Sequence, residues 1–500
     1  MLRACLRTTV FLLLSSLPAA AGPVTLLSKA DPGHPSGTAG GASEALGISS
    51  DGRYVLLQSN ADNLLPGMTD ANAGENLFLY DRMAGTTVLV SHAAGDPSTT
   101  ADAEVTNAVL SADGRWVAFA STASNLVAGQ VETLIQNSIT APDVFLWDRD
   151  SGVISLVSHQ PGLPTTAAGG CWPINGLGIS ADGNRVVFGS SAPNLVAGQS
   201  GGSSPGDVFL YDRATDTNTL VSHASGSVTT ATGLTSNSVL SADGSWVAFT
   251  SAATNLVAGQ IDTNSGSDLF LYSQATGANV LMSHAAGAAT TAANPESDNA
   301  FSSQPPISIS ADGSQVAYWS DATNLVAGQV DTNSDSDIFL YDRVAGTNTL
   351  VSHTAATATT AANGNCWEPV LSADGRYVVF LSTSSDLVAG DTNGWWDVFV
   401  HDRMAGTNIL VSRRDAGTPA DHFSFEPRIS ADGAWIVFVS EAGNLVAGQT
   451  GTSSNGNAFL WSRASGTLTL VSRKPGTTAT ATDVGILQMS ADASWIALES

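Results

Sequence analysis

Positive charge is scarce in this sequence. Its 500 residues include 18 Lys and Arg against 44 Asp and Glu, which gives a formal net charge of −26 at pH 7. Binding to nucleic acid depends mainly on Lys and Arg that neutralise phosphates, and anionic membrane surfaces attract the same residues. The composition therefore argues against nucleic acid and anionic membrane surfaces as partners, and favours a solubilising acidic exterior.

Long apolar runs are missing as well. After the N-terminus, no segment approaches the ~18 consecutive apolar residues of a membrane-spanning helix. The N-terminus itself combines Arg3 and Arg7 with a short apolar stretch at 10–17 and small residues at 19–21, which is typical of a secretory signal peptide. We therefore expect a signal peptide at residues 1–21 and a soluble, monomeric mature protein at 22–500, secreted or periplasmic.

Cysteine is rare, with three residues in the whole chain. Cys5 falls in the expected signal peptide, which leaves Cys171 and Cys366, each in a Cys-Trp pair before the same repeated element. Export permits a disulfide, but about three repeats separate the two residues. We interpret them as buried free thiols, with a disulfide as the alternative.

Helical periodicity is absent too, because no window carries an apolar pattern with the helical period, so we expect almost no helix. The sequence has instead one unit that is repeated from end to end. The tetrad Ser-x-Asp-Gly returns every ~58–69 residues, and in an eighth copy Ala493 replaces the Gly. The aspartates of the copies are Asp51, Asp113, Asp182, Asp243, Asp312, Asp374, Asp432 and Asp492.

Each unit follows the same order of segments, which residues 107–158 illustrate. NAVLS predicts a short strand, Ala-Asp-Gly a turn, WVAFAS a second strand, DVFLWDR a third and VISLVSH a fourth. The second and third strands are apolar on both faces, whereas the fourth is more polar and suits an outer edge. Neighbouring units must cover the inner strands, which predicts four-stranded antiparallel blades arranged as a single β-propeller.

These units resemble the repeats of TolB-type, WD-like β-propellers, a family of exported bacterial proteins. The likeness lies in Ser-Ala-Asp-Gly before the second strand, D-[VIL]-F-[LV]-[YWH]-[DS] as the third strand, and Leu-Val-Ser at the end of the fourth. It covers nearly the whole expected mature chain and implies an all-β fold. Propellers host many functions, so the resemblance implies no particular activity.

The number of blades follows from the strands that can be counted. Eight first and second strands are present, the last being GILQMS and WIALES, against seven third strands, the last being NAFLWSR. The segment PVTLLS at 23–28 has the pattern of a fourth strand. We therefore expect eight blades, closed by strands from both termini so that no edge is left open, with seven blades as the alternative.

A pattern of Asp-x-Asn-x-x-x-[Asp/Asn] before several third strands is a candidate calcium site. Calcium binds six to eight hard oxygens, which alternate Asp and Asn side chains can supply. The start resembles an EF-hand loop, but Ser336 stands where that loop needs Gly, so the alternative is a strand lead-in whose Asp and Asn favour turns. The residues are Asp262, Asn264, Asp268, Asp331, Asn333, Asp335, Asp337, Asp391, Asn393 and Asp397, with a weaker copy at Asp70, Asn72 and Asn76.

Five units end the fourth strand with a histidine, and Arg413 and Arg473 take its place in two later ones. Residues spread singly around a wide ring cannot converge on one zinc ion, so we interpret the series as repeated surface histidines. The Ser-Ala-Asp-Gly tetrad resembles the Asp-box of sialidases, but Gly follows Asp directly, which favours a structural turn. The histidines are His92, His159, His223, His284 and His353.

Acidic residues in the connectors before first strands, and tryptophans on loops or at blade entrances, are further candidates. At the mouth of a propeller channel, paired carboxylates would serve catalysis, and tryptophans would stack on a sugar or pack under loops. The carboxylates are Glu44, Glu104, Glu296, Asp298, Glu368, Asp421 and Glu426. The tryptophans are Trp172, Trp367, Trp395 and Trp396.

Three functions remain open on the sequence alone. The near-identical repeats favour an exported, non-catalytic binding or scaffold propeller for a protein or glycan ligand. The alternative is an exported glycan-active enzyme that uses channel-mouth carboxylates, which a pair ~5–10 Å apart would favour. A calcium-stabilised structural propeller is compatible with the first function.

Overall fold

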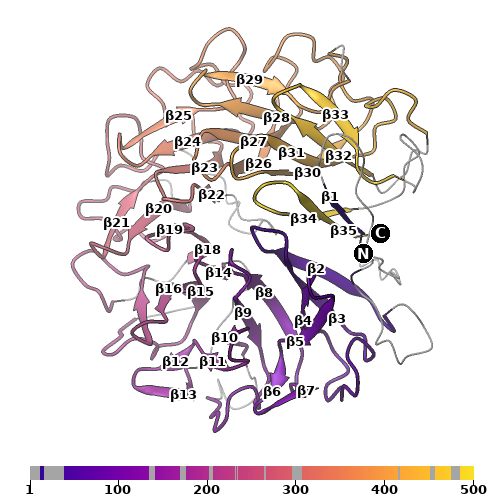
Figure 1. The fold of residues 1–500 in the computed structure, drawn as a ribbon. Coiled ribbons are helices and arrows are strands. Elements are labelled where there is room, and N and C mark those ends of the chain that lie inside the picture. Colours follow the sequence, from indigo (N-terminus) through magenta and orange to yellow (C-terminus); the bar gives the residue numbers. More distant parts are fainter. Residues whose placement is uncertain are drawn as a thin grey trace.

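The computed structural model describes residues 12–15, 27, 39–133, 141–168, 176–201, 206–230, 232, 235–263, 266–294, 307–414, 417–450, 456–473 and 485–499. All regular structure in these residues is β, and they contain no helix that is long and apolar enough to cross a membrane. Seven four-stranded sheets and a three-stranded one surround a common centre (Figure 1). The expected propeller of antiparallel blades is confirmed, and its four-stranded blades number seven, the alternative count.

In every blade the strands pair in chain order, with the first strand nearest the centre (Figure 1). Blade 1 consists of β2 (Ser43–Ile48), β3 (Tyr54–Ser59), β4 (Asn76–Asp81) and β5 (Thr86–Leu89). Blade 2 consists of β8 (Val105–Leu110), β9 (Trp116–Ser121), β10 (Asp143–Asp148) and β11 (Ile154–Leu156). Blade 3 consists of β14 (Gly178–Ile179), β15 (Arg185–Ser190), β16 (Asp207–Asp212) and β17 (Thr217–Leu220).

The other four blades repeat this order. Blade 4 consists of β18 (Thr235–Leu240), β19 (Trp246–Ser251), β20 (Asp268–Ser273) and β21 (Ala278–Leu281). Blade 5 consists of β22 (Ile307–Ile309), β23 (Gln315–Ser320), β24 (Asp337–Asp342) and β25 (Thr347–Leu350). Blade 6 consists of β26 (Cys366–Leu371), β27 (Tyr377–Ser382), β28 (Asp397–Asp402) and β29 (Thr407–Leu410). Blade 7 consists of β30 (Ser424–Ile429), β31 (Trp435–Ser440), β32 (Asn457–Ser462) and β33 (Thr467–Leu470).

The eighth unit forms a smaller sheet between blades 7 and 1 (Figure 1). Its strands are β34 (Gly485–Met489) and β35 (Trp495–Glu499), and β1 (Leu12–Ser15) pairs antiparallel with β35. Segments from both ends of the chain thus share one sheet, but β1 lies within residues 1–21, the expected signal peptide, and this unit is not a complete eighth blade. The segment at 23–28, expected to supply the N-terminal strand, lies outside the described residues apart from Leu27.

Two short hairpins follow the outer strands of blades 1 and 2. They are β6 (His92–Ala93) with β7 (Asp96–Thr100), and β12 (His159–Gln160) with β13 (Leu163–Ala167).

The core lies between the blades, because the second and third strands are buried on both faces. In blade 2, Phe119 of β9 lies opposite Phe145 of β10, and the ring centroids are 5.6 Å apart. Such buried aromatic pairs add to the stability of the sheet beyond their area. Equivalent ring pairs occur in blades 3 to 7 at Phe188–Phe209, Phe249–Phe270, Tyr318–Phe339, Phe380–Phe399 and Phe438–Phe459.

An arginine–aromatic stack joins neighbouring blades beside the Ser-Ala-Asp-Gly turns. Arg149 of blade 2 lies over the Tyr54 ring of blade 1, with 4.1 Å between the guanidinium carbon and the ring centroid. Gly114 of blade 2 packs on the same ring with a φ of 68°, so both its conformation and the close ring favour glycine. Equivalent stacks are Arg82 over Trp495, Arg213 over Trp116, Arg343 over Trp246 and Arg463 over Tyr377.

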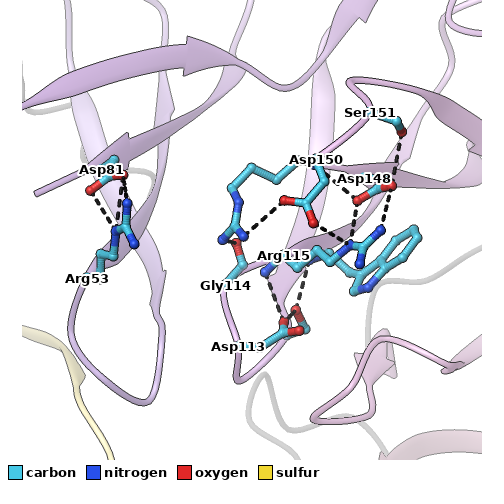
Figure 2. A network of polar contacts seen from close by, with 11 residues as sticks. Arg53, Asp81, Asp113, Gly114, Arg115, Asp148, Asp150 and Ser151 are labelled. Carbon is cyan, nitrogen blue, oxygen red and sulfur yellow. Dashed lines mark hydrogen bonds and ion pairs between the residues drawn. The ribbon is translucent and has the colours of Figure 1, made fainter. Parts of the chain in front are cut away.

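Ion pairs fasten the start of the second strand to the end of the third (Figure 2). Arg53 Nη2 lies 2.7 Å from Asp81 Oδ2, and Arg115 Nε lies 2.8 Å from Asp148 Oδ1. Solvent-exposed pairs of this kind contribute little to stability, because water and salt screen them. In the same view, Asp113 Oδ1 accepts the Arg115 backbone N–H at 2.9 Å, so the aspartate of the tetrad serves its own turn.

The histidine series is buried between blades rather than exposed, so its interpretation as a set of surface histidines is wrong. His223 Nδ1 lies 3.1 Å from its neighbour's carbonyl, Ala224 O, and its Nε2 lies 2.9 Å from Gly277 O in the next blade. Both oxygens are acceptors, so donation to both at once requires a proton on each ring nitrogen. His92 and His284 form the same type of bridge, whereas His159 Nε2 lies 3.1 Å from the side chain of Asp216 in the next blade.

Candidate functional site

Five rings from blades 6 and 7 lie where the inner strands begin, as one pair and one group of three; we call them the blade 6–7 aromatic cluster. Trp367 of β26 and Trp396, which precedes β28, have centroids 4.9 Å apart. Trp395 stacks on His422 at 4.9 Å and meets Phe423 edge-on at 4.6 Å. β26 and β30 are inner strands that lie side by side near the centre (Figure 1). The cluster therefore lies at the N-terminal ends of two neighbouring inner strands.

The loop at 391–397, DTNGWWD, positions the two adjacent tryptophans. Asn393 Oδ1 accepts the Trp395 backbone N–H at 2.9 Å, while its Nδ2 donates to Asp397 Oδ2 at 2.6 Å and to Ala420 O at 2.8 Å. The Ser424 backbone N–H donates to Trp396 O at 2.8 Å. The loop is therefore tied both to its own strand and to blade 7, which holds the cluster in a fixed place.

Two glutamates accompany the cluster in equivalent positions. Glu368 follows Trp367 and Glu426 follows Phe425, each before a proline, where the pairing of the inner strand shifts in register. Their φ angles are 53° and 51°, which is left-handed backbone that costs about 1–2 kcal/mol for a residue with a side chain. Strained residues and bulges of this kind concentrate at functional sites and redirect side chains.

Charge is distributed unevenly around these glutamates. Burial raises the pKa of the Glu368 carboxyl, and Arg428 of β30 lowers it again. On the other side of the cluster, His422 Nδ1 lies 2.6 Å from Glu441 Oε2. The site therefore combines ring faces with carboxylates, a guanidinium and an imidazole.

Exposure makes this cluster available to a ligand. Trp367 is 46% exposed although it lies on an inner strand, and Glu426 beside Phe425 is exposed as well. Aromatic side chains offer a flat apolar face, and polar groups next to them fix orientation. Such a surface suits a sugar ring, which has apolar C–H faces and hydroxyl edges.

The other predicted channel-mouth carboxylates lie elsewhere in the ring. Glu44 is in β2 of blade 1, and Glu104 directly precedes β8 of blade 2. Asp421 Oδ1 accepts the backbone N–H of Gly443 at 2.8 Å. Glu296 and Asp298 lie outside the described residues. Blades 6 and 7 therefore bring Glu368 and Glu426 onto adjacent inner strands, and Asp421 lies next to His422 of the cluster, while Glu44 and Glu104 belong to blades 1 and 2.

The candidate calcium loop of blade 5 is a closed network of turns. Asp331 Oδ1 accepts the Asn333 backbone N–H at 3.1 Å, Asn333 Oδ1 accepts that of Asp335 at 3.3 Å, and Asn333 Nδ2 donates to Ala362 O at 2.9 Å. Asp331 Oδ2 is buried without a hydrogen-bond partner. Among the described residues, no group of three or more His, Cys, Asp or Glu is placed to hold a metal ion, although calcium also binds amide and backbone oxygens.

Asx residues in the other loops have related roles. In the blade 1 copy, Asn72 Oδ1 accepts the Gly74 backbone N–H at 2.7 Å, and Asp70 Oδ1 accepts that of Asn72 at 3.3 Å. In the blade 4 copy, Asp262 and Asp268 are described, whereas Asn264 lies outside the described residues. Calcium binding by these loops remains a prediction.

Sequence reasoning missed a buried pair that recurs in the blades. The first residue of each third strand is Asp or Asn and is buried, and in blade 5 the Ser352 hydroxyl donates to Asp337 Oδ1 at 2.6 Å. Burial raises the pKa of Asp337 to about 8 and that of Asp397 to about 7. The same Ser–Asp bond occurs at Ser158–Asp143, Ser222–Asp207, Ser283–Asp268 and Ser412–Asp397.

This pair changes the meaning of the calcium pattern. Asp143 and Asp207 begin the third strands of blades 2 and 3, whose preceding loops lack the Asp-x-Asn pattern. The last aspartate of the pattern is therefore a structural residue of the blade. Its signal in the sequence was the constant Ser at the end of the fourth strand.

Cys366 is a buried free thiol, as predicted. Its Sγ lies 3.2 Å from Ser382 Oγ, and burial raises the pKa of the thiol to about 12. A protonated, enclosed thiol is chemically inert. Cys171 and Trp172 lie outside the described residues.

The described sheets make this chain a β-propeller, with repeats that resemble those of TolB-type propellers. No protein-family model matches the sequence, and no curated protein matches it. Several solved structures are similar to it at low identity.

One similar structure is a putative TolB from Agrobacterium tumefaciens, with 17% identity, a TM-score of 0.33, and coverage of 65% of this chain and 88% of that one. Another is an oligogalacturonate lyase from Vibrio parahaemolyticus, with 12% identity, a TM-score of 0.40, and coverage of 79% and 84%. A prolyl endopeptidase structure has 11% identity and a TM-score of 0.46 over 86% of this chain and 49% of that one, so the chain spans about half the length of that enzyme. At these identities the likeness concerns the fold alone.

Proposed function

We propose that the protein is an exported binding propeller that takes a glycan on the blade 6–7 aromatic cluster. The observation that carries the proposal is the Trp367 ring, which contacts Trp396 and is still 46% exposed. Trp395, the residue before Trp396, contacts His422 and Phe423 of the next blade. Tryptophan is enriched at interfaces, because it offers a large apolar face and a polar edge. Glu368, Glu426 and Arg428 supply hydrogen-bonding groups for hydroxyls beside the rings.

Binding rather than scaffolding alone is supported by the rigidity of the cluster. The hydrogen bonds of Asn393 and Ser424 fix its backbone before a ligand arrives, and pre-organised surfaces lose less entropy on binding. Export is supported by the predicted signal peptide at residues 1–21.

A glycan microarray followed by calorimetric titration with the best oligosaccharide tests this proposal. Trp367→Ala is expected to weaken binding by at least about tenfold, because a central aromatic contact contributes more than ~1.4 kcal/mol. Met404→Ala is the matched control, since Met404 is an exposed apolar residue of the same blade on the β28–β29 turn. Equal affinities of the two variants, or no bound glycan on the array, would overturn the proposal.

A second candidate function, a glycan-active enzyme, is favoured by the raised pKa of Glu368 and its place next to Glu426 on the adjacent inner strand. A carboxyl that keeps its proton can act as a general acid. To test for catalysis, the protein is incubated with the glycan that it binds, and newly released reducing ends are measured. We expect binding without turnover; turnover that disappears in Glu368→Gln would replace the binding function with catalysis.

Calcium forms part of the same proposal as a stabilising ion at the Asp-Asn loops. Its support is electrostatic: besides burial, Asp331, Asp335 and Asp321 each raise the pKa of Asp337. A divalent cation near these carboxylates would remove that repulsion.

A further inference from the structure

A cavity of about 700 Å³ opens between blades 1 and 2 at the outer part of the propeller. Its walls are β5, the β6–β7 hairpin, and the end of β10 with the turn into β11. The corresponding space between blades 5 and 6, beside His353, measures about 220 Å³. The junction of blades 1 and 2 is therefore the more open of the two, although the repeat places the same strands around both.

From this cavity we infer a second binding site, one that takes a small, neutral, mostly apolar molecule carrying one hydrogen-bond acceptor. The site is separate from the blade 6–7 aromatic cluster and its ligand is of another class. A volume of 300–1,000 Å³ is typical of small-molecule pockets, and the cavity falls in this range.

Apolar side chains dominate the walls. Leu89, Leu126 and Ile154 are buried around the cavity. Val88 and Val153 also line it and are 43% and 56% exposed, which places uncovered aliphatic surface beside an open space. A ligand that covers these two valines gains from the hydrophobic effect.

One polar group in the cavity lining has no partner. Trp147 is 3% exposed, lines the cavity, and its indole N–H finds no acceptor in the described part of the chain. At the next junction Tyr211 takes the place of this tryptophan, and its hydroxyl donates to Asp216 Oδ1 at 2.8 Å. A buried donor without an acceptor is unfavourable, so a ligand oxygen placed there would be bound with direction as well as with apolar contact.

Charged groups in the lining are already engaged, which fixes the charge of the ligand. Arg149 stacks over Tyr54, and its guanidinium bonds to Gly114 O at 2.9 Å and to Asp150 Oδ1 at 3.1 Å. His92 places Nδ1 at 2.9 Å from Ala93 O and Nε2 at 3.1 Å from Gly152 O. Neither side chain is left to pair with an anionic ligand, so the ligand is neutral and needs an acceptor for the indole N–H.

Nile red is the probe for this site, because it is neutral, largely apolar and carries a carbonyl acceptor. Titration of the full chain with the dye, followed by its fluorescence, should show saturable binding at one site. Val153→Trp, which fills the mouth, is expected to weaken binding by more than about tenfold, since it covers the apolar surface that a ligand would cover. Val344→Trp, at an exposed turn of blade 5, is the control and should leave binding unchanged.

A second pair of variants tests the hydrogen bond. Trp147→Phe removes the N–H and is expected to weaken binding by about threefold to tenfold. Trp461→Phe is matched, because Trp461 has the same position in blade 7 and an indole N–H that is likewise buried without a described partner. Thermal melting checks that each variant is folded. If Trp147→Phe does not fold, Val153→Trp still tests the site, because Val153 is at an exposed position. Equal effects of Val153→Trp and Val344→Trp, or loss of binding in Trp367→Ala, would overturn the inference.

Discussion

Two regions of the molecule use similar residue types: the junctions between blades, and the blade 6–7 aromatic cluster. The contacts at the junctions recur around the ring, whereas those of the cluster belong to blades 6 and 7. At the junctions, an arginine lies over an aromatic ring of the preceding unit in five places. In the described residues the cluster has three tryptophan contacts, and two strained glutamates and a guanidinium lie beside it. We therefore expect these chemical groups to serve stability where they recur and ligand binding where they occur once.

Repetition predicts how each region responds to substitution. In a repeat protein, stability is close to a sum of unit and neighbour contributions. A change at a junction should therefore lower stability wherever it is made, whereas a change in the cluster should alter binding and leave unfolding nearly unchanged. The following predictions test this contrast in order of decreasing effect.

The largest effect is expected at a turn glycine. Gly114 has a φ of 68°, and a Cβ there would lie 2.5 Å from Tyr54 Cδ2. Gly114→Ala combines a left-handed backbone with overpacking, so it should lower the free energy of unfolding by about 2–5 kcal/mol. Urea denaturation measures the change.

Gly95→Ala separates the two causes. Gly95 also has a positive φ, 77°, but a Cβ there would meet nothing within 4 Å. This control should cost about 1–2 kcal/mol from the backbone alone. If both variants lost the same stability, the junction ring would contribute nothing to the choice of glycine.

An intermediate effect is expected from the buried aspartate of blade 5. The pKa of Asp337 is raised to about 8 by burial, against ~3.9 in an unfolded chain. Its protonated form therefore contributes stability that is complete below about pH 4 and is lost as pH rises toward 8. Asp337→Asn should leave the free energy of unfolding nearly unchanged at pH 4 and raise it at pH 9, where the wild-type carboxyl is ionised, as measured by denaturation across this pH range.

Blade 7 provides the matched case, because it already has Asn457 at the equivalent position. An Asn457→Asp variant should gain the pH dependence that Asp337→Asn loses. Parallel stability curves of wild type and Asp337→Asn from pH 4 to 9 would show instead that the carboxyl is ionised throughout.

The repeat made the strands of each blade predictable, but not the contacts between neighbouring blades. Seven third strands could be counted because their apolar pattern is local, and each forms where it was expected. The burial of His223 could not be read from its strand, since its partner Gly277 lies one repeat later in the sequence. The incomplete eighth unit follows from the missing third strand, and in the described residues the N-terminal strand that pairs with it is β1, within the expected signal peptide.

The candidate site was predictable only in part. Trp367, Trp395 and Trp396 were predicted as candidates, because large aromatic residues in loops and at strand starts are unusual. Of the predicted carboxylates, Glu368 and Glu426 lie beside them. The sequence analysis missed His422, Arg428 and Glu441. Their contacts join residues on different strands, and strand register cannot be read from residues that are adjacent in the sequence. A signal was present in the parallel segments CWEP and SFEP, where a glutamate before proline follows an aromatic residue in two consecutive blades.

The smallest effect concerns calcium, and it decides whether the Asp-Asn loops belong with the junctions or form sites of their own. Calcium at ten times its dissociation constant should stabilise the protein by about 1.4 kcal/mol per site, seen as a higher melting temperature than in EDTA. Asp331→Ala should remove the response, because Asp331 Oδ2 is the buried oxygen without a partner in blade 5. Asp113→Ala is the control, since Asp113 serves a turn outside these loops and its variant should still respond. A melting temperature that ignores calcium would leave these loops as strand lead-ins, with the same standing as the repeated turns; a response that also flattens the pH dependence of Asp337 would place the ion beside that carboxyl.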